Sequence, residues 1–322
     1  MEIKLIDILK ASDNIKGIVR KTPLEYSYDL SKLTDANVYL KLENQQKTGS
    51  FKLRGATNKI KSLTKEEMKK GVVTASAGNH AQGVAYVSNM LGIDAKIVVP
   101  TTAPKTKIES TKRLGANVLV HGKDYDGSEE HAYEIEKNED RTFVHAFNDS
   151  KIIAGQGTIG LELLEDNKDL DIILVPAGGG GLISGIARAC KYIKPDIKII
   201  AIQPEVSKPW YEAFKNKKYT KIEMFDSLAD GLVGDIHADM VDDFNKFVDD
   251  VVLVSEDSIK KALYYLIDKH HQIAEGSSVV GIAALLDNKI DVKGKNIATI
   301  ITGCNIDTVK VKEIINEYEG RI

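Results

Sequence analysis

The sequence has few cysteines, no long apolar run and no repeated or low-complexity segment. Cys190 and Cys304 are the only cysteines among 322 residues, and they lie far apart without the spacing of a metal site. A disulfide framework is therefore excluded, and two free thiols predict a cytoplasmic protein. No apolar run approaches the roughly 20 residues of a membrane span, and the N-terminus lacks the apolar core of a signal peptide.

The charges of the chain nearly cancel. Lysines and arginines number 44 and acidic residues 47, which gives a formal net charge of -3 at pH 7. Proteins that bind nucleic acid carry a basic patch or stripe, and none is visible, so we expect neither a nucleic-acid nor a membrane partner. The acidic stretch from Asp235 to Asp250 looks like a solvated connection without chemistry of its own.

Short apolar runs alternate with helical patterns along most of the chain. Strands that alternate with helices predict an α/β fold with mainly parallel sheets, covered by helices on both faces. The sequence marks no clear linker between domains. The clearest apolar runs are 96–100, 117–120, 197–202, 251–254 and 297–301.

Lys52 lies where a loop enters a predicted helix. The segment 38–43 alternates like a half-buried strand, a turn at Thr48 and Gly49 follows, and an amphipathic pattern begins after Lys52. The positive end of a helix disfavours another positive charge, so the pKa of Lys52 should fall toward neutrality. A neutral amine can form a Schiff base with an aldehyde cofactor, although most lysines at a helix start are solvated surface residues.

A second informative segment, 72–83, is an apolar strand that runs into a small polar turn before another helix. Backbone N–H groups at such a helix start can hold a carboxylate, and Ser76 and Asn79 add neutral donors. The pattern also fits an ordinary joint in which Asn79 caps the helix. His80 is better interpreted as a packed or capping histidine than as a base.

Four consecutive glycines, Gly178 to Gly181, follow a third apolar strand at 172–177 and precede a helix. Glycine allows several backbone N–H groups to converge on one phosphate. No Gly-Lys-Ser/Thr follows, which excludes a P-loop, and no early βαβ unit with a ribose-binding acid supports a dinucleotide site. A flexible loop is the alternative, but four glycines cost much backbone entropy, which favours phosphate binding.

In this order and spacing, the three motifs resemble those of the serine/threonine dehydratase family of pyridoxal 5′-phosphate (PLP) enzymes. The resemblance implies the tryptophan-synthase-β-like fold (PLP fold type II), with two open, mainly parallel sheets. It also implies a large PLP-binding domain of residues 1–62 and 149–322 and a small inserted domain of residues 63–148, with the cofactor in the cleft between them. Further similar segments are 153–158, 227–231, 274–276 and 302–305.

The resemblance assigns a role to each motif. Lys52 would form the Schiff base with PLP and abstract the Cα proton of an amino-acid substrate, while Phe51 would pack on one face of the cofactor ring. Asn79 would also reach the phenolic oxygen of PLP, and Thr302 would face the pyridine nitrogen. The substrate carboxylate would lie on Ser76, Ala77, Gly78, Asn79 and His80, and the phosphate on Gly178, Gly179, Gly180 and Gly181, followed by Leu182.

A neutral hydroxyl at Thr302 bears on the choice of reaction. It cannot stabilise a protonated pyridinium as an aspartate would, so the cofactor is a weaker electron sink, which favours β-elimination over transamination. The expected reactions convert L-threonine to 2-oxobutanoate and ammonia, and L-serine to pyruvate and ammonia.

Three alternatives remain open. Serine racemases of this family carry a second serine where this chain has Ala77. A 3-hydroxyaspartate dehydratase needs a cation for the distal carboxylate, for which Arg54 is a candidate. A PLP-free binding protein of the same fold is disfavoured by the intact Lys52 and glycine run.

Gln203 and Pro209 stand where cation-binding members of the family carry Glu and Asp. Because hard cations prefer such anionic oxygen ligands, we expect no metal unless Glu205 substitutes for them. A last helix is predicted near 307–318, and no regulatory extension for feedback control is expected. The resemblance to short catabolic enzymes implies a homodimer or homotetramer.

Overall fold

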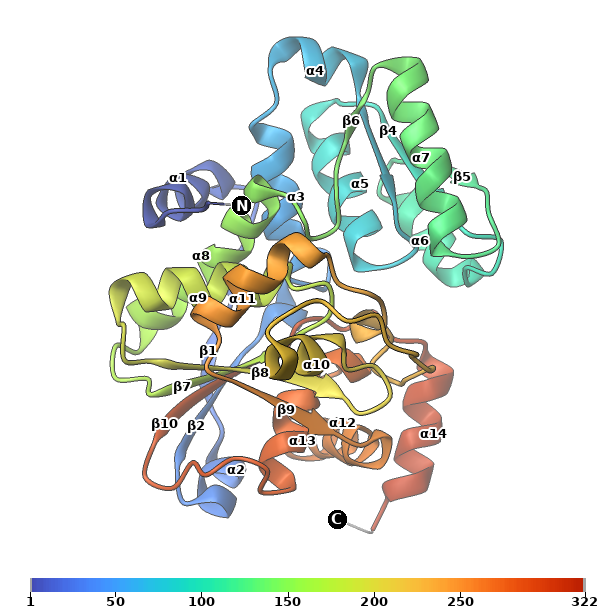
Figure 1. Ribbon diagram of the computed structural model, residues 1–322. Coiled ribbons are helices and arrows are strands. Elements are labelled where there is room, and N and C mark those ends of the chain that lie inside the picture. Colours follow the sequence, from blue (N-terminus) through green and yellow to red (C-terminus); the bar gives the residue numbers. More distant parts are fainter. Residues whose placement is uncertain (1, 321–322) are drawn as a thin grey trace.

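The computed structural model describes residues 2–320 and contains two sheets (Figure 1). A six-stranded sheet has the order β1-β2-β10-β7-β8-β9, in which only β1 and β2 are antiparallel. A four-stranded sheet has the order β5-β4-β3-β6 and is wholly parallel. The strands are β1 Leu24–Tyr26, β2 Asn37–Lys41, β3 Val72–Ala75, β4 Ala95–Val99, β5 Asn117–Val120, β6 Thr142–Phe143, β7 Ile172–Pro176, β8 Lys198–Pro204, β9 Asp250–Val254 and β10 Asn296–Ile300.

Helices connect the parallel strands, as the alternation of patterns in the sequence predicts. The predicted runs coincide with β4, β5, β8, β9 and β10, and the last predicted helix coincides with α14. The helices are α1 Leu5–Ile15, α2 Tyr28–Thr34, α3 Lys52–Lys61, α4 Lys65–Lys70, α5 Asn79–Leu91, α6 Lys105–Arg113, α7 Tyr125–Glu139, α8 Ser150–Asp166, α9 Gly181–Ile193, α10 Pro209–Asn216, α11 Val241–Phe247, α12 Glu256–His270, α13 Val280–Leu286 and α14 Thr308–Tyr318.

Both faces of the six-stranded sheet are buried, which explains why β7 is a continuous apolar run. Successive side chains of a strand point to opposite faces. Ile173 and Val175 pack into the core formed with α1, α8 and α9, whereas Ile172 and Leu174 pack into the core formed with α2, α12 and α13. The smaller sheet is covered in the same way by α5 on one face and α7 on the other.

The smaller sheet lies above the larger one in Figure 1, and its four strands fall within the expected insert of residues 63–148. All strands of the larger sheet fall outside that range. We propose that residues 1–62 with 149–322, and residues 63–148, form the two domains expected from the sequence. No helix of residues 2–320 is long and apolar enough to cross a bilayer.

The interpretation of residues 235–250 as a solvated connection is wrong. This stretch contains α11, whose Val241, Phe244 and Phe247 are buried in the core beside α9. Asp243 forms an ion pair of 2.5 Å with the buried Arg188. The apolar residues recur at helical spacing between the acidic ones, so the stretch is an amphipathic helix whose exposed face carries the charge.

A buried ion cluster anchors α3 to its neighbours. Arg54 donates to Glu43 at 2.8 Å and to Glu162 of α8 at 2.6 Å, and Lys41 donates to Glu162 at 2.7 Å. The side chains of Lys41, Glu43 and Arg54 are all inaccessible to solvent. Burial alone would lower the pKa of Arg54, but the two carboxylates more than offset it and hold the pKa above its usual value.

We predict that Arg54→Met lowers the free energy of unfolding by about 3–5 kcal/mol, because it leaves a buried carboxylate without its partner. Urea unfolding of the apoprotein measures the change. Lys16→Met is the matched control, since Lys16 pairs with Asp13 on the surface and such exposed pairs contribute less than about 1 kcal/mol. Equal effects of the two substitutions would contradict the structural role of the cluster.

Candidate active site

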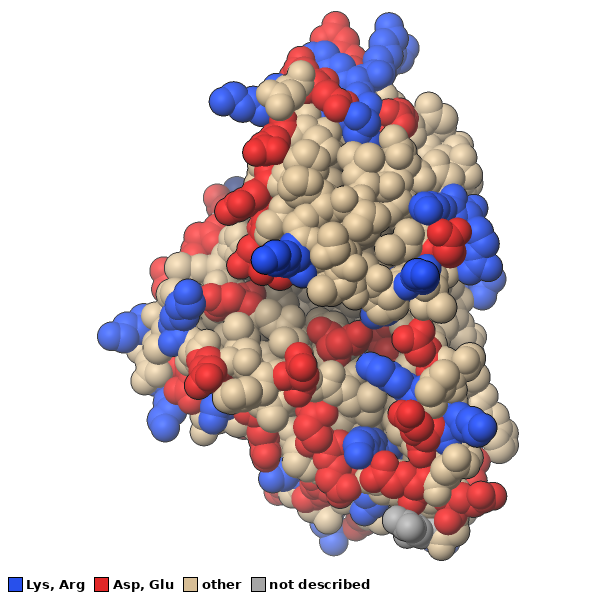
Figure 2. Space-filling view, turned by 90° about the vertical axis from the view of Figure 1, so that its right-hand side faces the viewer, with Lys and Arg blue, Asp and Glu red and all other residues tan. Residues whose placement is uncertain are grey.

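A cavity of about 280 Å³ lies where the carboxyl ends of β3 and β7 face one another. Figure 2 shows the surface hollowed between the upper and lower parts of the molecule. Open α/β sheets usually bind ligands at the carboxyl ends of their strands. The cavity brings together nearly all the residues predicted from sequence, namely Phe51, Lys52, Ser76, Gly78, Asn79, His80, Gly178, Gly179, Gly180, Gly181, Leu182 and Thr302.

Lys52 is the first residue of α3, as predicted, and it lines the cavity. Its Nζ donates to the backbone oxygen of Ala146 at 2.9 Å and lies 5.4 Å from the centre of the Phe51 ring. Burial lowers the pKa of Lys52 to about 8, and the nearby Glu275 carboxyl partly opposes this shift. The predicted direction is confirmed, but burial rather than the helix end is the main cause.

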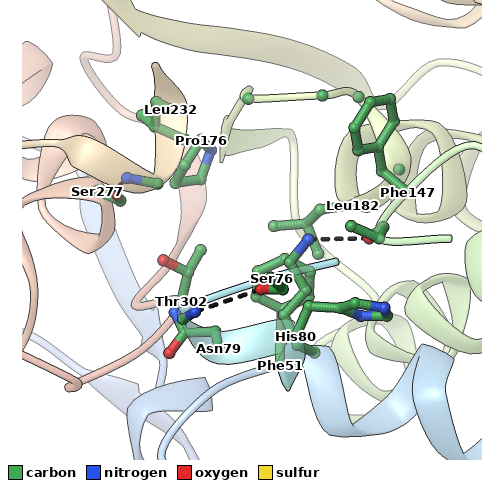
Figure 3. Close-up of a pocket in the computed structure, with 18 of the residues that line it drawn as sticks. Phe51, Ser76, Asn79, His80, Phe147, Pro176, Leu182, Leu232, Ser277 and Thr302 are labelled. Carbon is green, nitrogen blue, oxygen red and sulfur yellow. Dashed lines mark hydrogen bonds between the residues drawn. The ribbon is translucent and has the colours of Figure 1, made fainter. Parts of the chain in front are cut away.

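Backbone contacts with the end of β10 fix the start of α3. The N–H of Phe51 donates to the carbonyl of Thr302 at 3.0 Å, and Ser50 forms an isolated bridge with Gly303. These contacts place Lys52 beside Thr302, although the two residues lie near opposite ends of the chain. Figure 3 shows Phe51, Ser76, Asn79, His80 and Thr302 together in the lower part of the cavity, with Phe147 and Pro176 above them.

The four glycines connect β7 to the first turn of α9, as predicted. A β-carbon on Gly179 would lie 2.4 Å from the Phe147 ring, and one on Gly180 would lie 2.4 Å from the Trp210 ring. Gly180 also has a φ of +94°, which a side chain disfavours. Within residues 2–320, the N–H groups from Gly178 to Leu182 donate to no protein acceptor, so a helix start with free donors faces the cavity.

Residues 76–80, on the opposite wall, run from the end of β3 into the first turn of α5. Gly78 occupies the capping position of α5, so the alternative that Asn79 caps this helix is wrong. The Asn79 amide nitrogen donates to both oxygens of Glu275, at 2.8 and 3.0 Å. The Asn79 amide oxygen accepts from Asn305 at 2.5 Å. Ala77 does not line the cavity, because its methyl group packs against the core of the smaller sheet.

His80 is a packed, neutral histidine. Its Nε2 lies 2.9 Å from the carbonyl oxygen of Val144, to which a neutral ring can donate. Burial, with the nearby Lys52 amine, lowers the pKa of His80 to about 3. The interpretation of His80 as a packed histidine is therefore confirmed.

Thr302 presents a hydroxyl to the cavity from the end of β10. Its Oγ1 lies 2.9 Å from the hydroxyl of Ser278, which in turn accepts from the N–H of Gly303 at 2.8 Å. Ser278 is fully buried and thereby fixes the position of the Thr302 hydroxyl. The sequence alone did not reveal Ser278 as part of the site.

Glu275 is the main site residue that sequence reasoning missed. Its segment matched the family, but a single glutamate carries no local signature of a site. Its carboxyl lines the cavity, and burial raises its pKa to about 7, although the hydrogen bond from Asn79 opposes this shift. Other missed residues of the lining include Tyr125, Ala146, Phe147, Gln156, Asp230, Leu232 and Ser277.

Arg54 and Gln203 are both buried outside the cavity. Arg54 is enclosed by its two carboxylate partners, so the idea that it binds a distal substrate carboxylate is wrong. The Gln203 amide donates to the carbonyl of Ala177 at 3.0 Å and accepts from the N–H of Tyr211 at 3.0 Å. Glu205 is exposed, and no group of three or more His, Cys, Asp or Glu in the described chain is arranged to hold a metal.

We predict that Glu275→Gln stabilises the apoprotein in a pH-dependent manner. The folded protein keeps Glu275 protonated up to about pH 7, whereas an ordinary glutamate ionises near 4.5. As the pH rises from about 4.5 to about 7, this group lowers the free energy of unfolding of the wild type, whereas the uncharged glutamine of the variant does not. The variant should gain on the order of 3 kcal/mol in unfolding free energy at pH 8, and little at pH 4. A difference in unfolding free energy between variant and wild type that does not change with pH would contradict the raised pKa of Glu275.

Comparisons with known proteins agree with this geometry. The profile of the pyridoxal-phosphate dependent enzyme family matches residues 15–303. The L-threonine ammonia-lyase of Thermotoga maritima is 46% identical over 319 residues, which are 98% of this chain and 79% of the relative.

Two solved structures have the same fold. The processed threonine deaminase isoform 2 of Solanum lycopersicum is 37% identical, with a TM-score of 0.91 over 98% of this chain and 92% of that one. Maize serine racemase is 31% identical, with a TM-score of 0.93 over 99% of this chain and 98% of that one. With a fold of the tryptophan-synthase-β-like type and a family match over most of its length, the chain belongs to the pyridoxal-phosphate dependent enzymes.

Proposed function

We propose that the protein is a PLP-dependent threonine/serine dehydratase that converts L-threonine to 2-oxobutanoate and ammonia, and L-serine to pyruvate and ammonia. The observation that carries the proposal is the Lys52 amine, whose pKa is lowered to about 8, facing a glycine loop with free N–H groups across one cavity. The threonine ammonia-lyase and threonine deaminase among the relatives support this choice of substrate.

The residues of the cavity fit PLP. The free N–H groups from Gly178 to Leu182 would hold the phosphate, and a side chain on Gly179 would collide with the Phe147 ring that lines the cavity. Phe51 would cover one face of the ring, and the Thr302 hydroxyl would meet the pyridine nitrogen. Bound PLP supplies the aldehyde for Lys52 and an electron sink for the bond that breaks at Cα.

Lys52 performs the proton transfer at Cα. A pKa of about 8 allows the amine to take up a proton and to release it near neutral pH. The Ala146 carbonyl, 2.9 Å from Nζ, holds the amine in place. Ser76 and the N–H groups at the start of α5 would orient the substrate carboxylate. The Thr302 hydroxyl would supply no negative charge to hold a proton on the ring nitrogen of PLP, which would favour loss of the β-hydroxyl.

Racemisation is the less favoured alternative. A racemase needs an acid/base group on each face of Cα, and Lys52 serves only one of them. The Ala77 side chain has no acid or base group, and its methyl group packs against the core of the smaller sheet. The neighbouring His80 ring is neutral and engaged with Val144, so it does not supply the second group.

A substrate with a second carboxylate is also disfavoured. Among the described residues of the lining, Lys52 is the only cation, whereas Asp230 and Glu275 are acidic. Figure 2 shows acidic side chains along the lower edge of the hollow. The cavity therefore suits the neutral side chain of threonine or serine better than that of 3-hydroxyaspartate. We further propose a homodimer or homotetramer located in the cytoplasm.

We predict that Lys52→Ala abolishes 2-oxobutanoate release from L-threonine, because the variant lacks both the Schiff-base amine and the Cα base. The wild type should act on L-threonine and L-serine and only weakly on 3-hydroxyaspartate. Borohydride reduction followed by peptide mass spectrometry should locate the cofactor on Lys52. Lys16→Ala is the control and should keep full activity. Retained activity in Lys52→Ala, with the cofactor fixed elsewhere, would overturn the proposal.

We predict that Ala77→Ser raises the ratio of D-serine to pyruvate formed from L-serine. A positioned acid/base group typically contributes about 10²–10⁴-fold to proton transfer. Because the Ala77 side chain packs away from the cavity, we expect only part of that gain, on the order of 10-fold. Chiral chromatography measures the ratio, and Ala77→Gly is the control without a hydroxyl. A wild type that makes D-serine as fast as pyruvate would refute the argument.

A further inference from the structure

The glycine loop is held from behind by two neutral side chains that do not line the cavity. The indole Nε1 of Trp210 donates to the carbonyl oxygen of Gly178 at 2.6 Å. The amide of Gln203 donates to the preceding carbonyl, that of Ala177, at 3.0 Å, and its oxygen accepts from the N–H of Tyr211 at 3.0 Å. Two consecutive peptide carbonyls are thus fixed, one by Gln203 of β8 and the other by Trp210 of α10.

The hydrogen bonds to these two carbonyls also determine where the next N–H groups of the loop point. In a trans peptide the C=O and the following N–H point in opposite directions. Because the carbonyls of Ala177 and Gly178 point to Gln203 and Trp210, the N–H groups of Gly178 and Gly179 point toward the cavity. Neither N–H has a protein acceptor in the described part of the chain.

The Trp210 ring is itself held rigidly. The side chain is fully buried, and its ring is stacked on Phe244 with centroids 4.1 Å apart and planes 12° apart. On the other side it touches the loop so closely that a β-carbon on Gly180 would lie 2.4 Å from Cζ2. Pro209 at the first turn of α10 fixes the backbone just before Trp210.

Without such a hold, glycine peptides can turn over easily, because glycine adopts positive and negative φ values almost equally well. A turned peptide would present a carbonyl oxygen, instead of an N–H, to a bound anion. We propose that Trp210 and Gln203 are positioning residues that keep the glycine loop in its phosphate-binding orientation before the cofactor arrives. This inference rests on the proposed assignment of Gly178–Gly181 to the PLP phosphate.

Trp210→Phe tests the proposal, because phenylalanine keeps a ring beside Phe244 but has no N–H to donate; its ring is also smaller than the indole, so Gln203→Met, which removes a donor with little change of volume, is tested beside it. The apoprotein is titrated with PLP and with pyridoxal, which lacks the phosphate. The comparison separates a loss of phosphate binding from a general loss of affinity for the cofactor ring. We expect the Kd of PLP to rise about 5- to 10-fold, as for a lost hydrogen bond, with the Kd of pyridoxal unchanged. The ³¹P resonance of bound PLP should shift or broaden.

Tyr192→Phe is the matched control, since it also removes an aromatic donor to a backbone carbonyl, that of Ile3 at 3.2 Å, far from the cavity. Gln203→Met is a second variant with the same expected result, and circular dichroism checks that each variant folds. Equal weakening of PLP and pyridoxal, or a PLP affinity and ³¹P spectrum like those of the control, would overturn the positioning role.

Gly179→Val separates this inference from the proposed phosphate site. A valine there blocks the loop, so it should abolish the advantage of PLP over pyridoxal. If Gly179→Val does so while Trp210→Phe matches its control, the loop binds phosphate and the positioning role is wrong. If Gly179→Val leaves PLP binding unchanged, the assignment of the loop to the phosphate is itself wrong.

Discussion

Burial of the Lys52 amine is the constraint on which the chemistry of this protein depends. An ammonium group far from water favours its neutral form, and burial lowers the pKa of Lys52 to about 8. Burial also favours the neutral form of Glu275, but for a carboxyl group this raises the pKa, here to about 7. Both groups therefore change protonation near neutral pH within one cavity, which is typical of a site that transfers protons.

The surrounding structure holds these groups in place without occupying the cavity. The buried cluster around Arg54 anchors α3 two residues after Lys52, and the hydrogen bond from Phe51 to Thr302 anchors its start. On the opposite side, Trp210 and Gln203 hold the glycine loop. Rigid supports of this kind reduce the loss of conformational freedom on binding, because the donors already point toward the ligand.

The fold and the local motifs could be predicted from sequence, because strands, helix starts and the glycine run have short-range signatures. Lys52 and Gly178–Gly181 lie where those signatures place them. Glu275, Ser278 and Trp210 could not be predicted, since their roles depend on neighbours distant in sequence. The same reason explains the error on Arg54: a sequence does not reveal that Glu43 and Glu162 enclose it. In sequence, the stretch that forms α11 resembles a solvated connection, because its acidic residues stand between the apolar ones that pack into the core.

The pKa of the Lys52 amine in the apoprotein tests this account most directly. Competitive acetylation across a pH series, read by peptide mass spectrometry, compares Lys52 with the exposed Lys16 in the same sample. We predict that the reactivity of Lys52 rises with a midpoint near pH 8, well below that of an ordinary lysine at 10.5. A midpoint equal to that of Lys16 would show that burial does not activate the amine, and would contradict the account.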